Sequence, residues 1–117
     1  MNHIELGQKG ENLAVDHLIV EKYNILHRNY KFKKGEIDIV CEKSNQLVIV
    51  EVKTRHTAII GEPYEAVTKN KQRQIIKVAN KYIEEYSINL DVRLDIISIV
   101  LNQYGVRIEH IEDAFYP

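Results

Sequence analysis

Long apolar runs are absent from this chain of 117 residues. No stretch approaches the roughly 18 consecutive apolar residues that a membrane span needs. The first residues, MNHIELGQKGEN, also lack the apolar core of a signal peptide. Cysteine is nearly absent, and the single Cys41 cannot form an intrachain disulfide. We therefore expect a cytoplasmic protein with no membrane segment.

Linker sequences and a strong net charge are missing as well. The chain has two prolines and five glycines, with no repeat, low-complexity tract or Pro/Gly-rich linker. Residues 1–117 are thus predicted to form a single domain. The net charge of −1 argues against a simple polybasic nucleic-acid binder. However, residues 22–81 hold 13 Lys and Arg against 6 Asp and Glu, which makes this part a candidate basic surface unless the charges are spread around the exterior.

Several catalytic signatures are also missing. The five histidines show no HExxH, HxH or Cys/His spacing, which argues against a zinc site. A P-loop, a dinucleotide-binding glycine fingerprint and a GxSxG elbow are absent, which argues against triphosphatase, dehydrogenase and serine-hydrolase chemistry and against a nucleotide cofactor. Cys41 lies among alternating apolar residues, so we expect a buried thiol rather than a nucleophile or ligand.

The most informative stretch is residues 35–55, with the sequence GEIDIVCEKSNQLVIVEVKTR. Two runs of alternating apolar and polar residues flank Ser44-Asn45, and this pattern predicts a β-hairpin. A turn symmetric about these two residues places one apolar set on a single face, which must lie on a core. The facing pairs on that side are predicted to be Ile37 with Val52, Ile39 with Val50, and Cys41 with Val48.

The opposite face of this hairpin gathers charge. The same register sets Asp38 opposite Glu51 and Glu36 opposite Lys53. Like charges about 5 Å apart across two strands are destabilising, so a divalent cation is the obvious partner for the two acids. Magnesium is commonly held by one or two carboxylates, and a nearby lysine can orient a water and offset charge on a phosphate. The alternative is a solvated strand face on which Lys53 pairs with one of the acids.

The remaining segments predict an α/β or α+β domain with a mixed sheet covered by helices. Hydrophobic periodicity predicts helices at 7–22 and 69–86, the first beginning at Gly7 and Gly10 and the second capped by Thr68. Strands are predicted at 23–32, 92–101 and 105–111, and residues 56–64 are predicted to form a mobile flap near the carboxylates. Phe115 and Tyr116 are predicted to pack onto the core.

The start of the second helix is a candidate anion site. Lys69, Lys71, Gln72 and Arg73 lie in its first turns, where backbone N–H groups and cationic side chains suit a phosphate. A solvated, charged helix face would have the same sequence. Glu11 lies in the first turns of the other helix, where the helix dipole alone favours an acid.

Taken in order, these motifs resemble a known family. The chain contains GxxGE at 7–11, ILHRNY at 25–30, GEIDIV at 35–40, VIVEVKTR at 48–55, KQRQI at 71–75, RLDII at 93–97 and DAF at 113–115. This arrangement is similar to the YraN-like family of small bacterial proteins, which is assigned to the PD-(D/E)XK nuclease superfamily. The resemblance covers nearly the whole chain. It implies an α/β, restriction-endonuclease-like core similar to that of Holliday-junction resolvases, with a five-stranded mixed sheet flanked by two or three helices.

The resemblance also implies a function, namely Mg²⁺-dependent hydrolysis of DNA phosphodiester bonds, with Mn²⁺ as a substitute ion and branched DNA as a candidate substrate. By position, it implies catalytic roles for Glu11, Asp38, Glu51 and Lys53, with the ion held by Asp38, Glu51, Glu11 and the carbonyl of Val52. Ile37 stands where the superfamily's name calls for proline. By analogy, the protein is expected to act as a homodimer.

Seven cationic or polar residues of the basic segment are predicted to contact DNA phosphates, a role without sequence preference. They are Arg28, Lys33, Lys34, Arg55, Lys71, Gln72 and Arg73. Two alternatives stay open at this point. One is a non-catalytic nucleic-acid-binding module that retains the nuclease fold, and the other is an RNA-directed nuclease.

Overall fold

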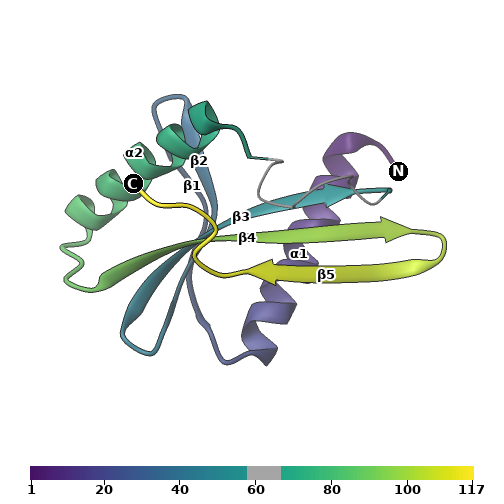
Figure 1. Ribbon diagram of the computed structural model, residues 1–117, viewed down its shortest axis with the longest axis horizontal. Coiled ribbons are helices and arrows are strands. Elements are labelled where there is room, and N and C mark those ends of the chain that lie inside the picture. Colours follow the sequence, from purple (N-terminus) through teal and green to yellow (C-terminus); the bar gives the residue numbers. More distant parts are fainter. Residues whose placement is uncertain (58–66) are drawn as a thin grey trace.

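Two helices and five strands make up the described part of the chain, residues 1–57 and 67–117, in this computed structural model (Figure 1). Most of the flap predicted at 56–64 lies outside the described residues. In chain order the elements are α1 (His3–Val20), β1 (Asn24–Phe32), β2 (Gly35–Lys43), β3 (Gln46–Arg55), α2 (Lys69–Glu85), β4 (Asp91–Asn102) and β5 (Gly105–Ile111).

The strands form one five-stranded mixed sheet, as predicted, and their order in the sheet is β1-β2-β3-β4-β5. All neighbours are antiparallel except β3 and β4, which run parallel. The segment between these two strands contains α2, because a parallel pair needs a long crossover connection. The sheet twists strongly, so that β1 and β2 cross the direction of β4 and β5 in Figure 1.

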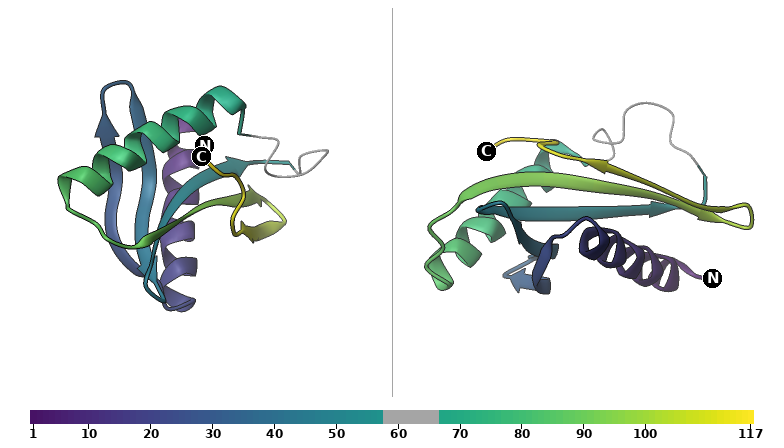
Figure 2. Two further views of the ribbon diagram at one scale, coloured as in Figure 1. Left: turned by 60° about the vertical axis from the view of Figure 1, so that its left-hand side comes forward. Right: turned by 90° about the horizontal axis from the view of Figure 1, so that it is seen from below.

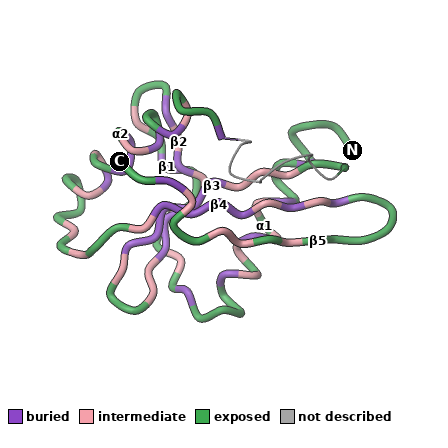
Figure 3. The backbone as a smooth tube through the Cα atoms, viewed as in Figure 1, coloured by how far each residue is buried: buried purple, intermediate pink, exposed green. Residues whose placement is uncertain are grey.

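The two helices cover opposite faces of the sheet (Figure 2). Alternation along β3 sends Leu47 and Ile49 toward α2, and Val48 and Val50 toward α1. This two-sided burial explains why β3 begins with a continuous apolar run, a pattern typical of strands covered on both faces. Figure 3 shows the resulting buried band along β3 and β4. Cys41 is fully buried in the α1 core, as predicted.

Helix α1 begins earlier than the sequence predicts. Its N-cap is Asn2, whose side chain accepts a 2.8 Å hydrogen bond from the backbone N–H of Glu5. The prediction that the helix begins at Gly7 and Gly10 is wrong, because both glycines lie inside it. Gly10 instead lies where α1 packs tightly against β3, because an added Cβ would lie 2.7 Å from Thr54 Cβ.

The second half of the chain largely follows the predictions. Thr68 caps α2 by accepting a 3.1 Å hydrogen bond from the backbone N–H of Lys71. Phe115 is buried in the α2 core, held there by the hydrogen bond between Ala114 N and Leu94 O. Tyr116 is 72% exposed, so the prediction that it packs is wrong. Phe115 already occupies the core surface next to Leu94, and the following residue points outward.

Candidate active site

The β2–β3 hairpin has the predicted register only near its turn. Ile39 pairs with Val50 and Cys41 with Val48, as predicted, but the ladder ends at the Ile39–Val50 pair. The predicted strand pairs of Ile37 with Val52, Asp38 with Glu51, and Glu36 with Lys53 are therefore wrong as ladder partners. The two strands fork at this point, and Oδ2 of Asp38 accepts a 2.8 Å hydrogen bond from the Val52 N–H inside the fork.

A change of face in β2 accounts for the fork. Ile37 packs in the core under α2, whereas Ile39 packs in the core under α1, so the prediction that both share one face is wrong. The change falls at Asp38. On the neighbouring strand β1, the residue between the partners of Ile37 and Ile39 is Asn29, which has a φ of 54°. A strand residue in this left-handed region interrupts the regular pleat.

Glu51 lies beside Asp38 and is almost completely buried, with only 5% of its side chain exposed. Burial, together with the neighbouring Asp38 carboxylate, raises the pKa of Glu51 to about 9, although Lys71 and Lys53 act in the opposite direction. The Lys71 ammonium lies 3.8 Å from Glu51 and reaches it from the first turn of α2. An ionised carboxylate here is costly unless a cation lies close to it.

Asp38 and Lys53 also face a cleft of about 370 Å³ between α1 and the sheet. Glu11 lines the same cleft from α1, so three of the four predicted catalytic residues line it. Glu51 does not line this cleft but lies next to Asp38 on the side of α2. Asp38 thus connects the cleft with the buried carboxylate. The structure gives Val52 a role through its N–H, and the proposed use of its carbonyl stays a prediction.

Glu11 is held by β1 rather than by the other acids. Its carboxylate receives hydrogen bonds from Arg28 Nη2 at 3.1 Å and from Asn29 Nδ2 at 3.0 Å. The same Asn29 amide donates to Glu36 at 2.9 Å. Within residues 1–57 and 67–117, no three His, Cys, Asp or Glu side chains are grouped closely enough to hold one metal ion.

Asn29 is therefore a site residue that the sequence analysis missed. It joins Glu11 and Glu36, and it lies on β1 beside the position of Asp38. Its signal in the sequence is an asparagine in the middle of a predicted strand, because Asn is among the few residues that adopt positive φ readily.

A second group of predicted residues lines a basic cleft of about 560 Å³ between the β1–β2 turn and α2. Four of its residues are cationic and none is acidic; they are Lys33, Lys34, Arg73 and Lys77. Lys77 was not predicted. It lies one helical turn after Arg73 and so points the same way. We call this group the basic cleft.

The other predicted phosphate-binding residues lie elsewhere. Arg28 pairs with Glu11, and Arg55 is exposed at the end of β3. Gln72 is buried, and its amide nitrogen donates a 3.0 Å hydrogen bond to the carbonyl of Val67. The structure thus does not bring Gln72 to the surface with the cations. Its position follows from the helix period, because it lies three residues before the buried Ile75.

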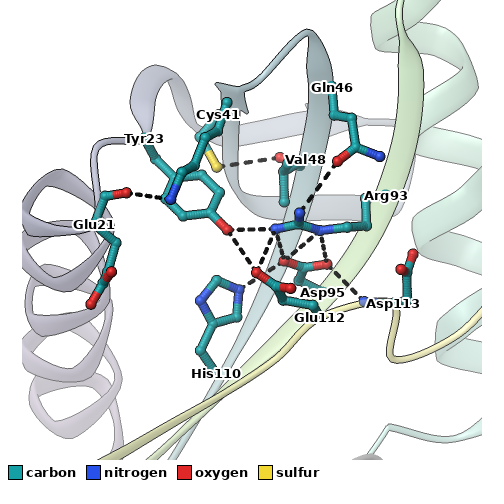
Figure 4. A network of polar contacts seen from close by, with 11 residues as sticks. Glu21, Tyr23, Cys41, Gln46, Val48, Arg93, Asp95, His110, Glu112 and Asp113 are labelled. Carbon is teal, nitrogen blue, oxygen red and sulfur yellow. Dashed lines mark hydrogen bonds and ion pairs between the residues drawn. The ribbon is translucent and has the colours of Figure 1, made fainter.

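A separate polar network lies on the α1 face around Arg93 and Asp95 of β4, which pair with Val48 and Val50 of β3 (Figure 4). Asp95 is fully buried and accepts hydrogen bonds from Arg93 Nη2 at 2.8 Å, from His110 Nε2 at 2.7 Å and from the Asp113 N–H at 3.1 Å. Arg93 also contacts the Tyr23 hydroxyl. Every buried side-chain polar atom in the described residues has a partner, so this network is a satisfied internal structure.

Comparisons with known proteins bear on the same residues. A family model described as "Uncharacterised protein family UPF0102" matches residues 10–99. A UPF0102 protein of Christiangramia forsetii is 46% identical over 97% of this chain and 96% of its own length. A UPF0102 protein of Phocaeicola vulgatus is 46% identical over 98% of this chain and 95% of its own length. One of Flavobacterium johnsoniae is 44% identical over 97% of this chain and 96% of its own length. The matched segment contains the four predicted catalytic residues and the basic cleft.

No helix in the described part of the chain is both long enough and apolar enough to cross a membrane.

Proposed function

The chain belongs to the uncharacterised protein family UPF0102, and from that premise we propose that it is a Mg²⁺-dependent endonuclease that hydrolyses DNA phosphodiester bonds. The observation that carries this proposal is the approach of the Asp38 and Glu51 carboxylates at the fork between β2 and β3. Two carboxylates are a ligand set that Mg²⁺ commonly uses in proteins, with water and substrate phosphate completing its shell. Mn²⁺ would occupy the same ligands.

The chemistry of these two acids fits such an ion. Glu51 is buried beside another carboxylate, and its cationic neighbour Lys71 is as far away as 3.8 Å. Asp38 has one oxygen held by the Val52 N–H, which fixes the carboxylate and leaves Oδ1 for a ligand. When bound, Mg²⁺ supplies Lewis acidity, which polarises the phosphodiester and acidifies a bound water.

Three further side chains around Asp38 and Glu51 complete the proposed site. Lys53 lines the same cleft as Asp38, where its ammonium can orient the attacking water and offset negative charge that grows on the phosphate. Glu11 reaches this cleft from α1 and would position the water once a phosphate draws Arg28 away from it. Lys71, now paired with Glu51, would exchange that partner for a phosphate oxygen.

The basic cleft would bind the DNA backbone on the α2 side of the site. Its four cations meet no acid among the residues that line it, and such contacts bind phosphates without reading the sequence. Branched DNA, which presents several backbone strands at once, is the substrate class we propose first. We propose that the protein acts as a homodimer, because paired sites suit cleavage of two strands.

One observation favours a second candidate function, a nucleic-acid-binding module without catalysis. Glu11 is ion-paired with Arg28 at 3.1 Å, and no three acids are grouped around one ion position in the described residues. A site that keeps this pair when DNA is bound would bind nucleic acid without assembling the third acid.

A cleavage assay separates the two candidates. Labelled duplex, forked, four-way and single-stranded DNA, and single-stranded RNA, would be incubated with the protein and Mg²⁺, Mn²⁺ or EDTA. We expect metal-dependent DNA cleavage that is lost in Asp38→Asn and in Lys53→Ala, and retained in Lys22→Ala, which removes one exposed cation outside the site. Binding without cleavage would support the second candidate, and cleavage of RNA alone would change the substrate. Full activity of Asp38→Asn would overturn the assignment of the site.

A further inference from the structure

The proposed function leaves the outer edge of β5 unused. Among the residues that the structure describes, β5 ends the sheet, and no strand lies on the outer side of its backbone. Asn102 pairs with Gly105 around the two-residue turn between β4 and β5, and this hydrogen-bonded pair fixes the alternation along the ladder. The N–H and C=O groups of Arg107 and Glu109 therefore point to β4. Those of Val106, Ile108 and His110 point outward.

The two edges of the sheet differ in how well they are protected against pairing. β1, at the other edge, contains the cationic Arg28 and Lys31, a register shift between Ile25 and His27, and the positive φ of Asn29. Charges and bulges of this kind are common devices that prevent a strand from pairing with another chain. β5 lacks the bulge, its ladder with β4 is uninterrupted, and its two charged residues, Arg107 and Glu109, are of opposite sign.

The charge pattern of β5 is self-complementary in one register. If two copies of β5 pair antiparallel about a two-fold axis at Ile108, Arg107 of each copy lies opposite Glu109 of the other. Opposite charges at directly facing positions stabilise a strand pair. A two-fold axis at Arg107 or at Glu109 would instead set like charges against each other. Val106, which is 49% exposed, would lie opposite His110 of the second copy.

We propose that the protein forms a homodimer by antiparallel pairing of β5 with β5 of a second copy, centred on Ile108, which joins the two sheets into one of ten strands. The outward backbone groups of Val106, Ile108 and His110 would make the new ladder. This inference rests on the homodimer in the proposed function and names its surface. It does not require that the protein cleaves DNA.

The pairing has a consequence for the candidate sites. A two-fold axis between antiparallel edge strands is perpendicular to the sheet, so both copies present α2 on the same side. Ile108 pairs with Ile99, and Ile99 pairs with Thr54. The two-fold axis at Ile108 is therefore level with Thr54, next to the candidate site. Five strand spacings of about 4.8 Å separate the two copies of β3, which places them about 24 Å apart. Both sites can therefore face one DNA molecule.

Hydrogen exchange tests the interface without any mutation. Sedimentation first defines the protein concentrations at which monomer and dimer prevail, and amide exchange is then measured at both. We expect the amides of Val106, Ile108 and His110 to exchange slowly in the dimer and quickly in the monomer. Those of Arg107 and Glu109 bond to β4 and should be protected in both. A protein that stays monomeric up to its solubility limit, or a dimer that leaves the three outward amides unprotected, would overturn the proposal.

A charge exchange tests the register. Arg107→Glu and Glu109→Arg each place two like-charged pairs in the interface, and we expect each to lower the association constant by at least about tenfold. The double variant restores opposite charges and should regain the wild-type association constant. Lys22→Glu, a charge reversal outside β5, should dimerise as the wild type does. Single variants that dimerise normally, or a double variant that stays monomeric while its thermal unfolding is normal, would refute the register.

These variants leave Asp38, Glu51 and Lys53 unchanged. Failure of the dimer therefore shows in sedimentation, whereas failure of the nuclease proposal shows as a well-formed dimer that does not cleave.

Discussion

The backbone N–H of Val52 donates a 2.8 Å hydrogen bond to Oδ2 of Asp38 at the point where β2 and β3 stop pairing. This contact replaces a missing ladder bond with a bond to a side chain. Asp38 therefore has a structural role in addition to its proposed role as a metal ligand, and substitutions at this position must separate the two.

Two substitutions at Asp38 make that separation. Asparagine retains an oxygen that can accept the Val52 N–H but lacks the charge that binds a cation, so Asp38→Asn should unfold close to wild type and lose stabilisation by Mn²⁺. Alanine removes both functions, and Asp38→Ala should also lose about 1–2 kcal/mol of unfolding free energy. Urea unfolding with Mn²⁺ and with EDTA measures both effects. Full Mn²⁺ stabilisation of Asp38→Asn would show that the ion does not use this carboxylate.

Glu51 should destabilise the metal-free protein. It is buried beside Asp38, and its raised pKa means that folding suppresses the ionised form, which predominates at neutral pH in the unfolded chain. Glutamine has the same shape without the charge, so we expect Glu51→Gln to raise the free energy of unfolding in EDTA, by on the order of 1–3 kcal/mol. The variant should gain nothing from Mn²⁺, whereas the wild type should gain stability. A less stable Glu51→Gln in EDTA would mean that Lys71 already compensates the charge.

The sequence was sufficient to predict the fold because its signals are local and consistent. Alternation on both sides of Ser44-Asn45 predicted the hairpin, and the stripe of apolar residues from Ile75 to Tyr82 predicted α2 with its Thr68 cap. The start of α1 was misplaced because glycine was taken as a helix boundary. Gly10 is inside the helix for a tertiary reason, the contact with Thr54, which no local pattern reveals.

The candidate site was predicted in its composition but not in its geometry. Strict alternation placed Ile37 on the same face of the sheet as Ile39. In the structure β2 changes face at Asp38, and the neighbouring residue of β1, Asn29, has a φ of 54°. A period-two pattern cannot show such a break, because the residue responsible lies on the neighbouring strand. The pairing of Glu11 with Arg28 likewise joins α1 to β1 and depends on tertiary packing.

Lys77 should contribute to DNA binding although no motif identified it. It lines the basic cleft with Arg73, so Lys77→Ala should weaken binding to duplexes of any sequence and reduce the slope of log affinity against log salt by about 1. Lys22→Ala removes the same charge from the turn after α1 and should leave the slope unchanged. Fluorescence anisotropy over a salt series measures both slopes. Equal slopes for the two variants would place the DNA elsewhere.

The Arg93–Asp95 network should make stability depend on pH in acid. Burial by itself would raise the pKa of Asp95, but hydrogen bonds from His110 and Arg93 outweigh it and hold the pKa below its ordinary value of 3.8. The folded state thus binds this proton less readily than the unfolded state does. The stabilisation is full above the ordinary pKa and is lost as the pH falls through the lower, folded pKa.

Urea unfolding from about pH 6 down to about pH 2.5 measures this dependence. Asp95→Asn removes the titrating group, so its stability should start lower and decline less steeply over the most acidic part of the range. The same acid slope in both proteins would assign the pH dependence to other carboxylates.

Two glycines in α1 provide a matched test of how the helix is seated on the sheet. Gly7 has open space around its missing side chain, whereas a methyl group at Gly10 would collide with Thr54 of β3. Alanine is the better helix former, so Gly7→Ala should stabilise the protein by about 0.5–1 kcal/mol. Gly10→Ala gains the same propensity but must push α1 away from β3, and overpacking of this kind costs about 1–3 kcal/mol. Thermal and urea unfolding should therefore shift in opposite directions for the two variants. Glu11 follows Gly10 directly, so the displaced helix in Gly10→Ala should also lower any DNA cleavage, whereas Gly7→Ala should leave cleavage unchanged. A stabilised Gly10→Ala would show that α1 is free to move relative to the carboxylates.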